Sequence, residues 1–261
     1  MFGRKKRQAQ PTEQPKQAYI VSRNAECWTQ GKEILEQAHI MIAGTTGCGK
    51  STLLKKLMWT ALAFTPGRMQ FIIVDMKMGI EMKQYAALPH TLRFARNGED
   101  AISALDYAIR IMTDRCNQMY AQDKVMWEGS DIYVVIDELA DLLQVCGSEA
   151  IDRLTKIGRL GRAARIHLLL ATQAPQRDRK SGLCAAIQQN MTCTIGMRCR
   201  TATESRQIIG VNGCESLPKY GTAYLAIGAD LWTLPIVPIS DDEGRERIAY
   251  WSDPANYTVY A

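Results

Sequence analysis

The residues between positions 44 and 51 have the types and the spacing that bind the phosphates of a nucleotide. They follow the pattern GxxxxGK[ST] and read Gly44, Thr45, Thr46, Gly47, Cys48, Gly49, Lys50 and Ser51. Glycines let successive backbone N–H groups surround a β-phosphate, and a helix that begins here adds partial positive charge. In such a loop Lys50 bridges the β- and γ-phosphates and the Ser51 hydroxyl binds Mg²⁺. We therefore expect the segment that ends at Thr52 to bind ATP together with Mg²⁺.

A pair of acids lies at the end of the apolar run Ile132–Ile136. Asp137 could hold the Mg²⁺ shell through water, and Glu138 is placed to polarise the attacking water as a general base. The same two acids could instead simply begin a helix, because carboxylates are favourable in a first turn. Since a phosphate loop precedes them, we favour the interpretation that the pair takes part in ATP hydrolysis.

A glutamine ends a third apolar run. Gln173 follows Leu168–Ala171 and Thr172, and at the carboxyl edge of a neighbouring strand it would reach the γ-phosphate or the attacking water. Alone this signal is weak, but it agrees with the other two. Together they predict a P-loop ATPase rather than a small-molecule kinase, which would need an arginine-rich lid and an acceptor site that we do not find.

These side chains require a sheet whose strands end at a common edge. The apolar runs of strand length are His39–Ala43, Phe71–Asp75, Ile132–Ile136, His167–Ala171, Thr192–Met197, Thr222–Ile227 and Trp232–Val237. Segments with helical periodicity separate the first five, and this alternation predicts an α/β fold with a mainly parallel sheet flanked by helices. The last two runs are close together in sequence and predict an antiparallel hairpin at one edge.

Composition and charge fit an ordinary globular chain. The 261 residues include 32 Lys+Arg and 27 Asp+Glu, for a net charge of +5, and 46% are apolar. Residues 1–17 carry +4 of this charge, and we expect them to form a flexible basic arm that contacts something acidic. No apolar run reaches the roughly 18 residues of a membrane span. Polar residues follow the basic start where a signal peptide would need apolar ones.

The eight cysteines show no CxxC pair and no histidine spacing suited to zinc. Several lie in apolar runs, which predicts reduced thiols in the core and a cytoplasmic protein. Cys48 is the exception, because it lies among backbone amides at the start of a helix, where the pKa of a thiol falls. We expect alkylation of Cys48 to block ATP binding and Mg-ATP to protect the thiol.

Several blocks of the sequence, in the same order, resemble the FtsK/SpoIIIE family of DNA translocase motors. They are residues 39–51, Asp75-Met-Lys77, Leu88-Pro-His90, and residues 134–141, 161–173, 221–225 and 240–243. The resemblance implies a RecA-like P-loop ATPase that forms a hexameric ring and moves double-stranded DNA through its pore. We divide the chain into a basic arm (1–17), a lead-in segment (18–38), the motor domain (39–253) and a C-terminal tail (254–261).

Under this resemblance the lysine, serine, acid pair and glutamine keep the roles given above. Arg162 lies where the family has an arginine in the turn before the glutamine strand, and Arg115 lies in the family's helix between the second and third core strands. Either could be the arginine that completes a neighbour's site in a ring, and we favour Arg162 slightly.

The sequence also departs from the family pattern. Ala174 stands where the family usually has Arg, and Arg165 stands where it usually has Gly. The family's motor normally has a subdomain before the phosphate loop, and chromosomal members have a winged-helix module after the motor. Only 38 residues precede the first expected strand. We therefore expect loading specificity to come from elsewhere, in a setting such as DNA transfer of a mobile element or a phage.

Two other functions fit the same motifs. Type VII secretion ATPases share much of the pattern and move protein, and ATP hydrolysis stimulated by a peptide but not by DNA would favour that function. A nucleotide-gated coupling or assembly module could bind ATP and recruit a relaxase or another DNA-processing partner. Negligible hydrolysis even on DNA would favour the module.

Basic residues in two loops are candidates for contacts with double-stranded DNA. They are Lys124, before the third core strand, and Arg177, Arg179 and Lys180, after the glutamine. We expect both loops at the sheet edge that faces the channel, where the basic side chains could follow phosphates without reading bases. Further basic residues recur at positions 153, 156, 159, 162 and 165, and this row is either a solvated helix face or a surface between subunits.

Overall fold

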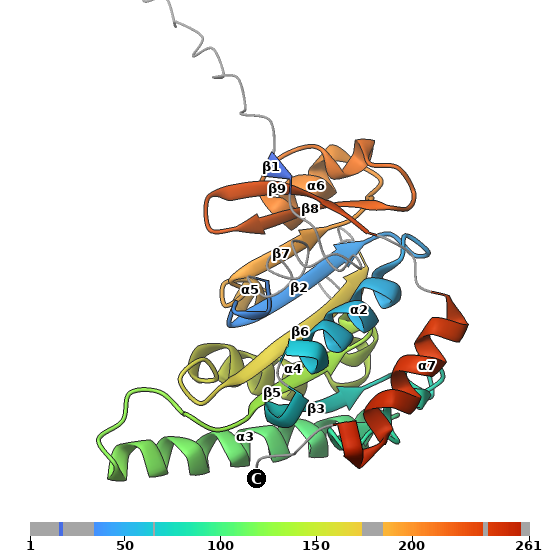
Figure 1. The fold of residues 1–261 in the computed structure, drawn as a ribbon. Coiled ribbons are helices and arrows are strands. Elements are labelled where there is room, and N and C mark those ends of the chain that lie inside the picture. The colour runs from blue at the N-terminus through green and yellow to red at the C-terminus, as the bar shows by residue number, and fades with distance from the viewer. Residues whose placement is uncertain (1–15, 18–33, 65, 174–184, 237–239, 257–261) are drawn as a thin grey trace, which may run out of the picture.

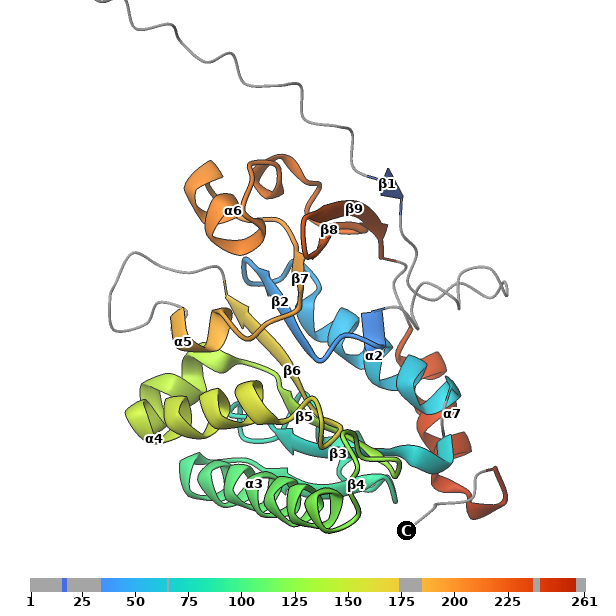
Figure 2. The same cartoon turned by 90° about the vertical axis from the view of Figure 1, so that its left-hand side faces the viewer.

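A computed structural model describes residues 16–17, 34–64, 66–173, 185–236 and 240–256 of the chain. Within these ranges nine strands form a single sheet in the order β1-β9-β8-β7-β2-β6-β5-β3-β4, with helices on both faces (Figures 1 and 2). The predicted α/β fold is therefore confirmed. In the same ranges, no helix is both long enough and apolar enough to cross a bilayer.

Six neighbouring strands of the described sheet run parallel, from β7 to the edge strand β4. They are β2 (His39–Gly44), β6 (Ile166–Gln173), β5 (Asp131–Ile136), β3 (Met69–Val74), β4 (Thr91–Ala95) and β7 (Cys193–Gly196). β2 pairs with β6 on one side and with β7 on the other. The other side of β6 pairs with β5. Because these strands share one direction, residues that follow β2, β5 and β6 meet at the same carboxyl edge.

One parallel strand is absent from the sequence-based expectation. β4 (Thr91–Ala95) pairs with β3 at the end of the sheet. Its residues are mostly half-buried, and Arg93 in its middle is exposed. A strand of this kind lacks the continuous apolar run that identifies a strand buried on both faces.

The last two strands form the expected antiparallel hairpin. β8 (Thr222–Ile227) pairs antiparallel with both β7 and β9 (Asp230–Pro235). The outer side of β9 pairs in turn with β1 (Lys16–Gln17), which runs parallel to it. The last two residues of the predicted flexible arm therefore belong to the sheet, and residues 1–15 lie outside the described ranges.

Helices cover both faces of the sheet (Figures 1 and 2), and each face has its own hydrophobic core. α3 (Gly98–Ala121) and α4 (Leu139–Leu160) pack on one face around side chains such as Ile72. α2 (Lys50–Phe64) packs on the other around Ile73, the next residue of the same strand. α7 (Asp241–Ser252) runs beside α2. The shorter helices are η1 (Pro66–Arg68), η2 (Lys83–Tyr85), α5 (Ala185–Gln188), α6 (Ala202–Ile209), η3 (Cys214–Ser216) and η4 (Pro254–Asn256).

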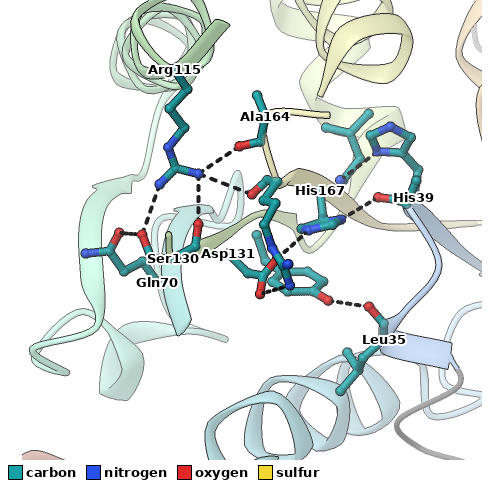
Figure 3. Close-up of polar contacts among 12 residues, drawn as sticks. Leu35, His39, Gln70, Arg115, Ser130, Asp131, Ala164 and His167 are labelled. Carbon is teal, nitrogen blue, oxygen red and sulfur yellow. Dashed lines mark hydrogen bonds and ion pairs between the residues drawn. The ribbon is translucent and has the colours of Figure 1, made fainter. Parts of the chain in front are cut away.

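A buried arginine connects α3 to the amino edge of the sheet, where β5 and β6 begin. Arg115 is 6% exposed and donates to the carbonyl oxygens of Ser130 and Ala164, both at 2.8 Å, and to Ser130 Oγ at 2.9 Å (Figure 3). Burial lowers the pKa of Arg115 to about 10, so the group stays charged at neutral pH. This geometry contradicts the expectation that Arg115 reaches a neighbour's nucleotide, because its guanidinium is enclosed and bonded within its own chain.

Arg115→Ala should lower the free energy of unfolding by about 3 kcal/mol, because it leaves two buried carbonyl groups without a donor. Urea denaturation monitored by circular dichroism measures the change. The matched control is Arg110→Ala on the same helix, whose side chain is exposed and should cost at most about 0.5 kcal/mol. Equal effects of the two substitutions would contradict the structural role assigned to Arg115.

Candidate nucleotide-binding site

The predicted phosphate loop connects β2 to α2 at the carboxyl edge of the sheet. At Gly44 a Cβ atom would lie 2.8 Å from Met197 Cβ and 2.9 Å from Cys48 Sγ, so the first position of the loop has no room for a side chain. Gly49 has φ +100, which favours glycine. At the tip, Thr46 and Gly47 are exposed. The backbone thus needs its first and last glycines for different reasons, one for space and one for conformation.

The lysine and the first threonine of the loop are held by backbone carbonyl groups. Lys50 Nζ donates to the carbonyl oxygens of Gly44 and Thr45, both at 3.0 Å. Thr45 donates in turn from N and Oγ1 to the carbonyl oxygen of Arg198, at 2.8 and 3.1 Å. Arg198 directly follows Met197 beyond β7, so that strand supports the loop from the side opposite β6. A backbone carbonyl group is the same in every residue, so the residue types in the sequence could not predict this contact.

The two predicted metal ligands are in direct contact. Ser51 Oγ donates to Asp137 Oδ1 at 3.1 Å, and Asp137, which follows β5, is 2% exposed. A hydroxyl and a carboxylate supply the oxygen atoms that Mg²⁺ prefers, so this donor set fits the metal that a phosphate loop requires. These two residues would hold the ion.

A lysine that the site prediction did not include shares the same carboxylate. Lys77 Nζ lies 3.1 Å from Asp137 Oδ2. Burial alone would lower the pKa of Lys77, but the contact with Asp137 outweighs it and raises the pKa above its ordinary value. Asp75 fixes the turn that presents this lysine by accepting from the backbone N–H groups of Lys77 at 3.0 Å and Met82 at 2.9 Å.

Glu138 and Gln173 are also in contact, beside the loop. Glu138 Oε1 accepts from the backbone N–H of Gln173 at 3.1 Å and from that of Ala140 at 3.4 Å. Gln173 is the register partner of Gly44 in the pair of β6 with β2. Glu138 is 2% exposed, and burial raises its pKa although the Gln173 N–H group opposes the shift. Because Glu138 also caps α4, the interpretation of the acid pair as a helix start holds as well.

The expected low pKa of Cys48 is wrong. Its thiol is 2% exposed and faces the sulfur atom of Met197 at 4.0 Å. Burial raises the pKa of Cys48 more than the charge of Lys50 lowers it. A buried, protonated thiol reacts slowly, so we withdraw the expectation that alkylation of Cys48 blocks ATP binding.

The remaining arginine candidate lies at the opposite edge. α4 ends at Leu160, and the exposed Arg162 lies in the turn that leads into β6 at the amino edge. The row of basic residues is therefore not one helix face, and its first member, Arg153, is bonded to Asp106. Arg165 has φ 53 and binds Asp131 through two hydrogen bonds, at 2.7 and 2.9 Å. This positive φ favours glycine, the residue that the family resemblance leads us to expect there, and the ion pair with Asp131 stabilises the arginine in that conformation.

Of the two loops proposed for DNA contact, the structure describes the one that carries Lys124. Lys124 lies between α3 and β5 at the amino edge and forms an ion pair with Glu128 at 2.6 Å. It therefore lies away from the phosphate loop, contrary to expectation, because the chain returns there to begin a parallel strand. Arg177, Arg179 and Lys180 lie outside the described residues.

Comparison with known proteins supports the family resemblance. The model of the FtsK/SpoIIIE family matches residues 6–126 and 119–177. The DNA translocase FtsK of Clostridium acetobutylicum is 31% identical over 201 residues, which are 71% of this chain and 26% of the relative. That of Staphylococcus epidermidis is 31% identical over 241 residues, or 84% of this chain and 30% of the relative. The chain thus spans less than a third of the length of these relatives.

Solved structures share the fold. The cytoplasmic domain of the type VII secretion ATPase EccC from Thermomonospora curvata has a TM-score of 0.66 and 27% identity, over 79% of this chain and 26% of that one. The pCW3 conjugation coupling protein TcpA has a TM-score of 0.69 and 23% identity, over 82% of this chain and 65% of that one. With a phosphate loop, an acid pair and a glutamine at one sheet edge, this chain belongs to the FtsK/SpoIIIE family of P-loop ATPases.

Proposed function

We propose that the chain is an ATP-driven translocase of double-stranded DNA that works as a hexameric ring in the cytoplasm. The observation that supports this most is the convergence of Lys50, Ser51, Asp137, Glu138 and Gln173 at one edge of the sheet, in a chain of the FtsK/SpoIIIE family. The named relatives are DNA translocases.

Each residue of the site has a role that follows from its position. Lys50 and the loop N–H groups bind the β- and γ-phosphates, and Ser51 and Asp137 would hold Mg²⁺. The ion supplies positive charge against the phosphate oxygens. Lys77 forms an ion pair with the Asp137 carboxylate and fixes it in place. Gln173 extends from the strand beside the loop and can contact the γ-phosphate.

Glu138 is suited to be the general base. One of its oxygens, Oε1, is fixed by two backbone N–H groups, whereas no hydrogen bond to Oε2 is found within the described residues. Oε2 can therefore accept a proton from a water molecule next to the γ-phosphate. Burial raises the pKa of Glu138 above its ordinary value, which strengthens the carboxylate as a base.

The separation of two surfaces supports the proposed ring. A contact between the carboxyl edge of one chain and the amino edge of the next is heterologous, and such contacts form a ring when the rotation between neighbours closes. In that arrangement Arg162, exposed at the amino edge, would face the neighbour's nucleotide. Arg177, Arg179 and Lys180, which lie outside the described residues, stay candidates for contacts with DNA phosphates. Lys124 forms an ion pair with Glu128 and lies at the amino edge, so we no longer count it among the candidate DNA contacts.

Movement of protein is the second candidate. The secretion ATPase EccC has the same fold at 27% identity. Stimulation of ATP hydrolysis by a peptide substrate but not by DNA would favour it.

Glu138→Gln should lower the ATPase rate at least about 100-fold and leave ATP binding intact, because the amide cannot accept the proton of the attacking water. Lys50→Ala should abolish binding as well, because it removes the cation that contacts the phosphates. Phosphate release measures the rate, and a fluorescent nucleotide measures the binding. A Glu138→Gln chain that hydrolyses ATP at the wild-type rate would refute the assignment of the base.

Arg162→Ala should reduce the ATPase rate about a thousandfold if Arg162 acts across the subunit contact. Mixing it in equal amounts with Glu138→Gln should restore part of the activity, because each variant supplies the residue that its neighbour lacks. Arg110→Ala, an exposed arginine on α3, serves as the matched control and should hydrolyse ATP normally. Absence of any recovery in the mixture would contradict the proposed role.

A further inference from the structure

The turn that follows β3 exposes two large apolar side chains at the carboxyl edge of the sheet. We call residues 75–82 the β3 turn. Met78 and Ile80 are 76% and 78% exposed, and Gly79 between them is buried. Single exposed apolar residues are ordinary, whereas apolar side chains that lie exposed together mark candidate interaction sites.

The β3 turn holds these side chains in a fixed position. Met78 has φ 62 and Gly79 has φ 77, so two successive residues adopt positive φ. A methionine in this conformation is uncommon, and it persists only where surrounding contacts fix the backbone. The buried Asp75 supplies them, because it accepts from the backbone N–H groups of Lys77 at 3.0 Å and Met82 at 2.9 Å, on either side of the exposed pair. The apolar pair therefore lies on a preformed turn.

A cavity of about 320 Å³ lies at the opposite, amino edge of the sheet. The apolar part of its wall comes from five elements or connections and consists of Leu35, Ala61, Met69, Met126 and Tyr133. The volume exceeds about 300 Å³, the lower end of the range for pockets that enclose small ligands, so two apolar side chains have room in it. Partner side chains that fill pockets of this kind supply most of the binding energy of an interface.

Apolar side chains are exposed beside this amino-edge cavity too. Val125 is 93% exposed and Met126 is 45% exposed, in the connection between α3 and β5. An exposed apolar turn at one edge and an apolar cavity at the other are complementary surfaces. Because they lie at opposite edges of one sheet, they can meet only between two copies of the chain, in a heterologous contact.

The charges around the amino-edge cavity fit the same partner. Of the acids on its wall, Asp131 is bonded to Arg165 (Figure 3), and Glu36 interacts with other groups of the chain. Arg162 also lines the cavity and is exposed, and we find no ion pair to it in the described ranges. The β3 turn offers the opposite charge, because Glu81 directly follows its second exposed apolar residue.

We propose that Met78 and Ile80 of the β3 turn enter the amino-edge cavity of a second copy of this chain and so form the subunit contact of the ring. The inference rests on the proposed function, because it names the residues of a contact that this function requires. It also accounts for the proposed position of Arg162. Lys77 of the same turn lies 3.1 Å from Asp137, so a cavity that receives the turn brings its own Arg162 beside the neighbour's metal site.

Cross-linking between copies tests the pairing. A tagged Ile80→Cys chain and an untagged Met126→Cys chain, mixed in equal amounts with Mg-ATP, should be joined by a short bismaleimide. Both positions are exposed, so neither substitution removes a core side chain. The matched control mixes Met126→Cys with Tyr250→Cys, an exposed position on α7 that lies outside the proposed contact. Equal yields of cross-linked dimer from the two mixtures would overturn the proposal.

Self-association gives a second readout. We expect Ile80→Asp to weaken it at least about tenfold, or 1.4 kcal/mol, because the substitution places a charge in an apolar cavity. Tyr250→Asp should change it by less than about twofold. Sedimentation velocity in Mg-ATP measures both, and wild-type self-association of Ile80→Asp contradicts the inference. If Ile80→Asp does not fold, the cross-linking result decides, since it uses the milder cysteine substitutions.

Failure of this contact and failure of the proposed function give different results. A wild-type chain that assembles on DNA and hydrolyses ATP, in a mixture that yields no cross-link between positions 80 and 126 above the control, refutes the inference alone. A wild-type chain that remains monomeric with Mg-ATP and DNA refutes the proposed ring together with its contact.

Discussion

The carboxylate of Asp137 is the group on which the rest of the site depends. It accepts from the Ser51 hydroxyl on one oxygen and from the Lys77 ammonium on the other, and so joins the start of α2 to the ends of β5 and β3. A buried carboxylate is costly unless it is bonded in this way. The sheet meets this requirement by keeping its central strands parallel, since only then do the three segments meet at one edge.

At the opposite, amino edge of the sheet, the polar groups of the turns must be hydrogen-bonded inside the protein. There the chain must turn back after α3 and α4 to begin β5 and β6, which leaves carbonyl groups of the turns inside the protein. Arg115 binds those of Ser130 and Ala164, and Asp131 binds Arg165 and His167 (Figure 3). One edge thus carries the candidate groups for nucleotide chemistry, and at the other Arg115, Asp131 and Arg165 are bonded within the chain, whereas Arg162 is exposed. A ring built from contacts between unlike edges requires such an asymmetry.

The sequence alone predicted those parts of the site whose residues are adjacent in the chain and form a recognisable pattern. The phosphate loop needs glycines and a lysine in fixed order, and the acid pair and Gln173 follow apolar strands directly. Lys77 reaches Asp137 only through the fold, and the carbonyl of Arg198 has no residue signature. The pKa of Cys48 was predicted with the wrong sign because desolvation exceeds the effect of the helix start. Why an arginine can occupy position 165 is explained only by the structure, which gives its φ of 53 and its hydrogen bond to Asp131.

The central claim is that ATP hydrolysis moves the chain along double-stranded DNA. Displacement of a third strand from a DNA triplex, followed in time with ATP, tests it most directly. The account predicts displacement that requires ATP, is abolished by Glu138→Gln, and weakens as salt rises, because phosphate contacts are screened and counterions compete. Triplex that stays intact while the wild-type chain hydrolyses ATP on the same DNA would contradict it.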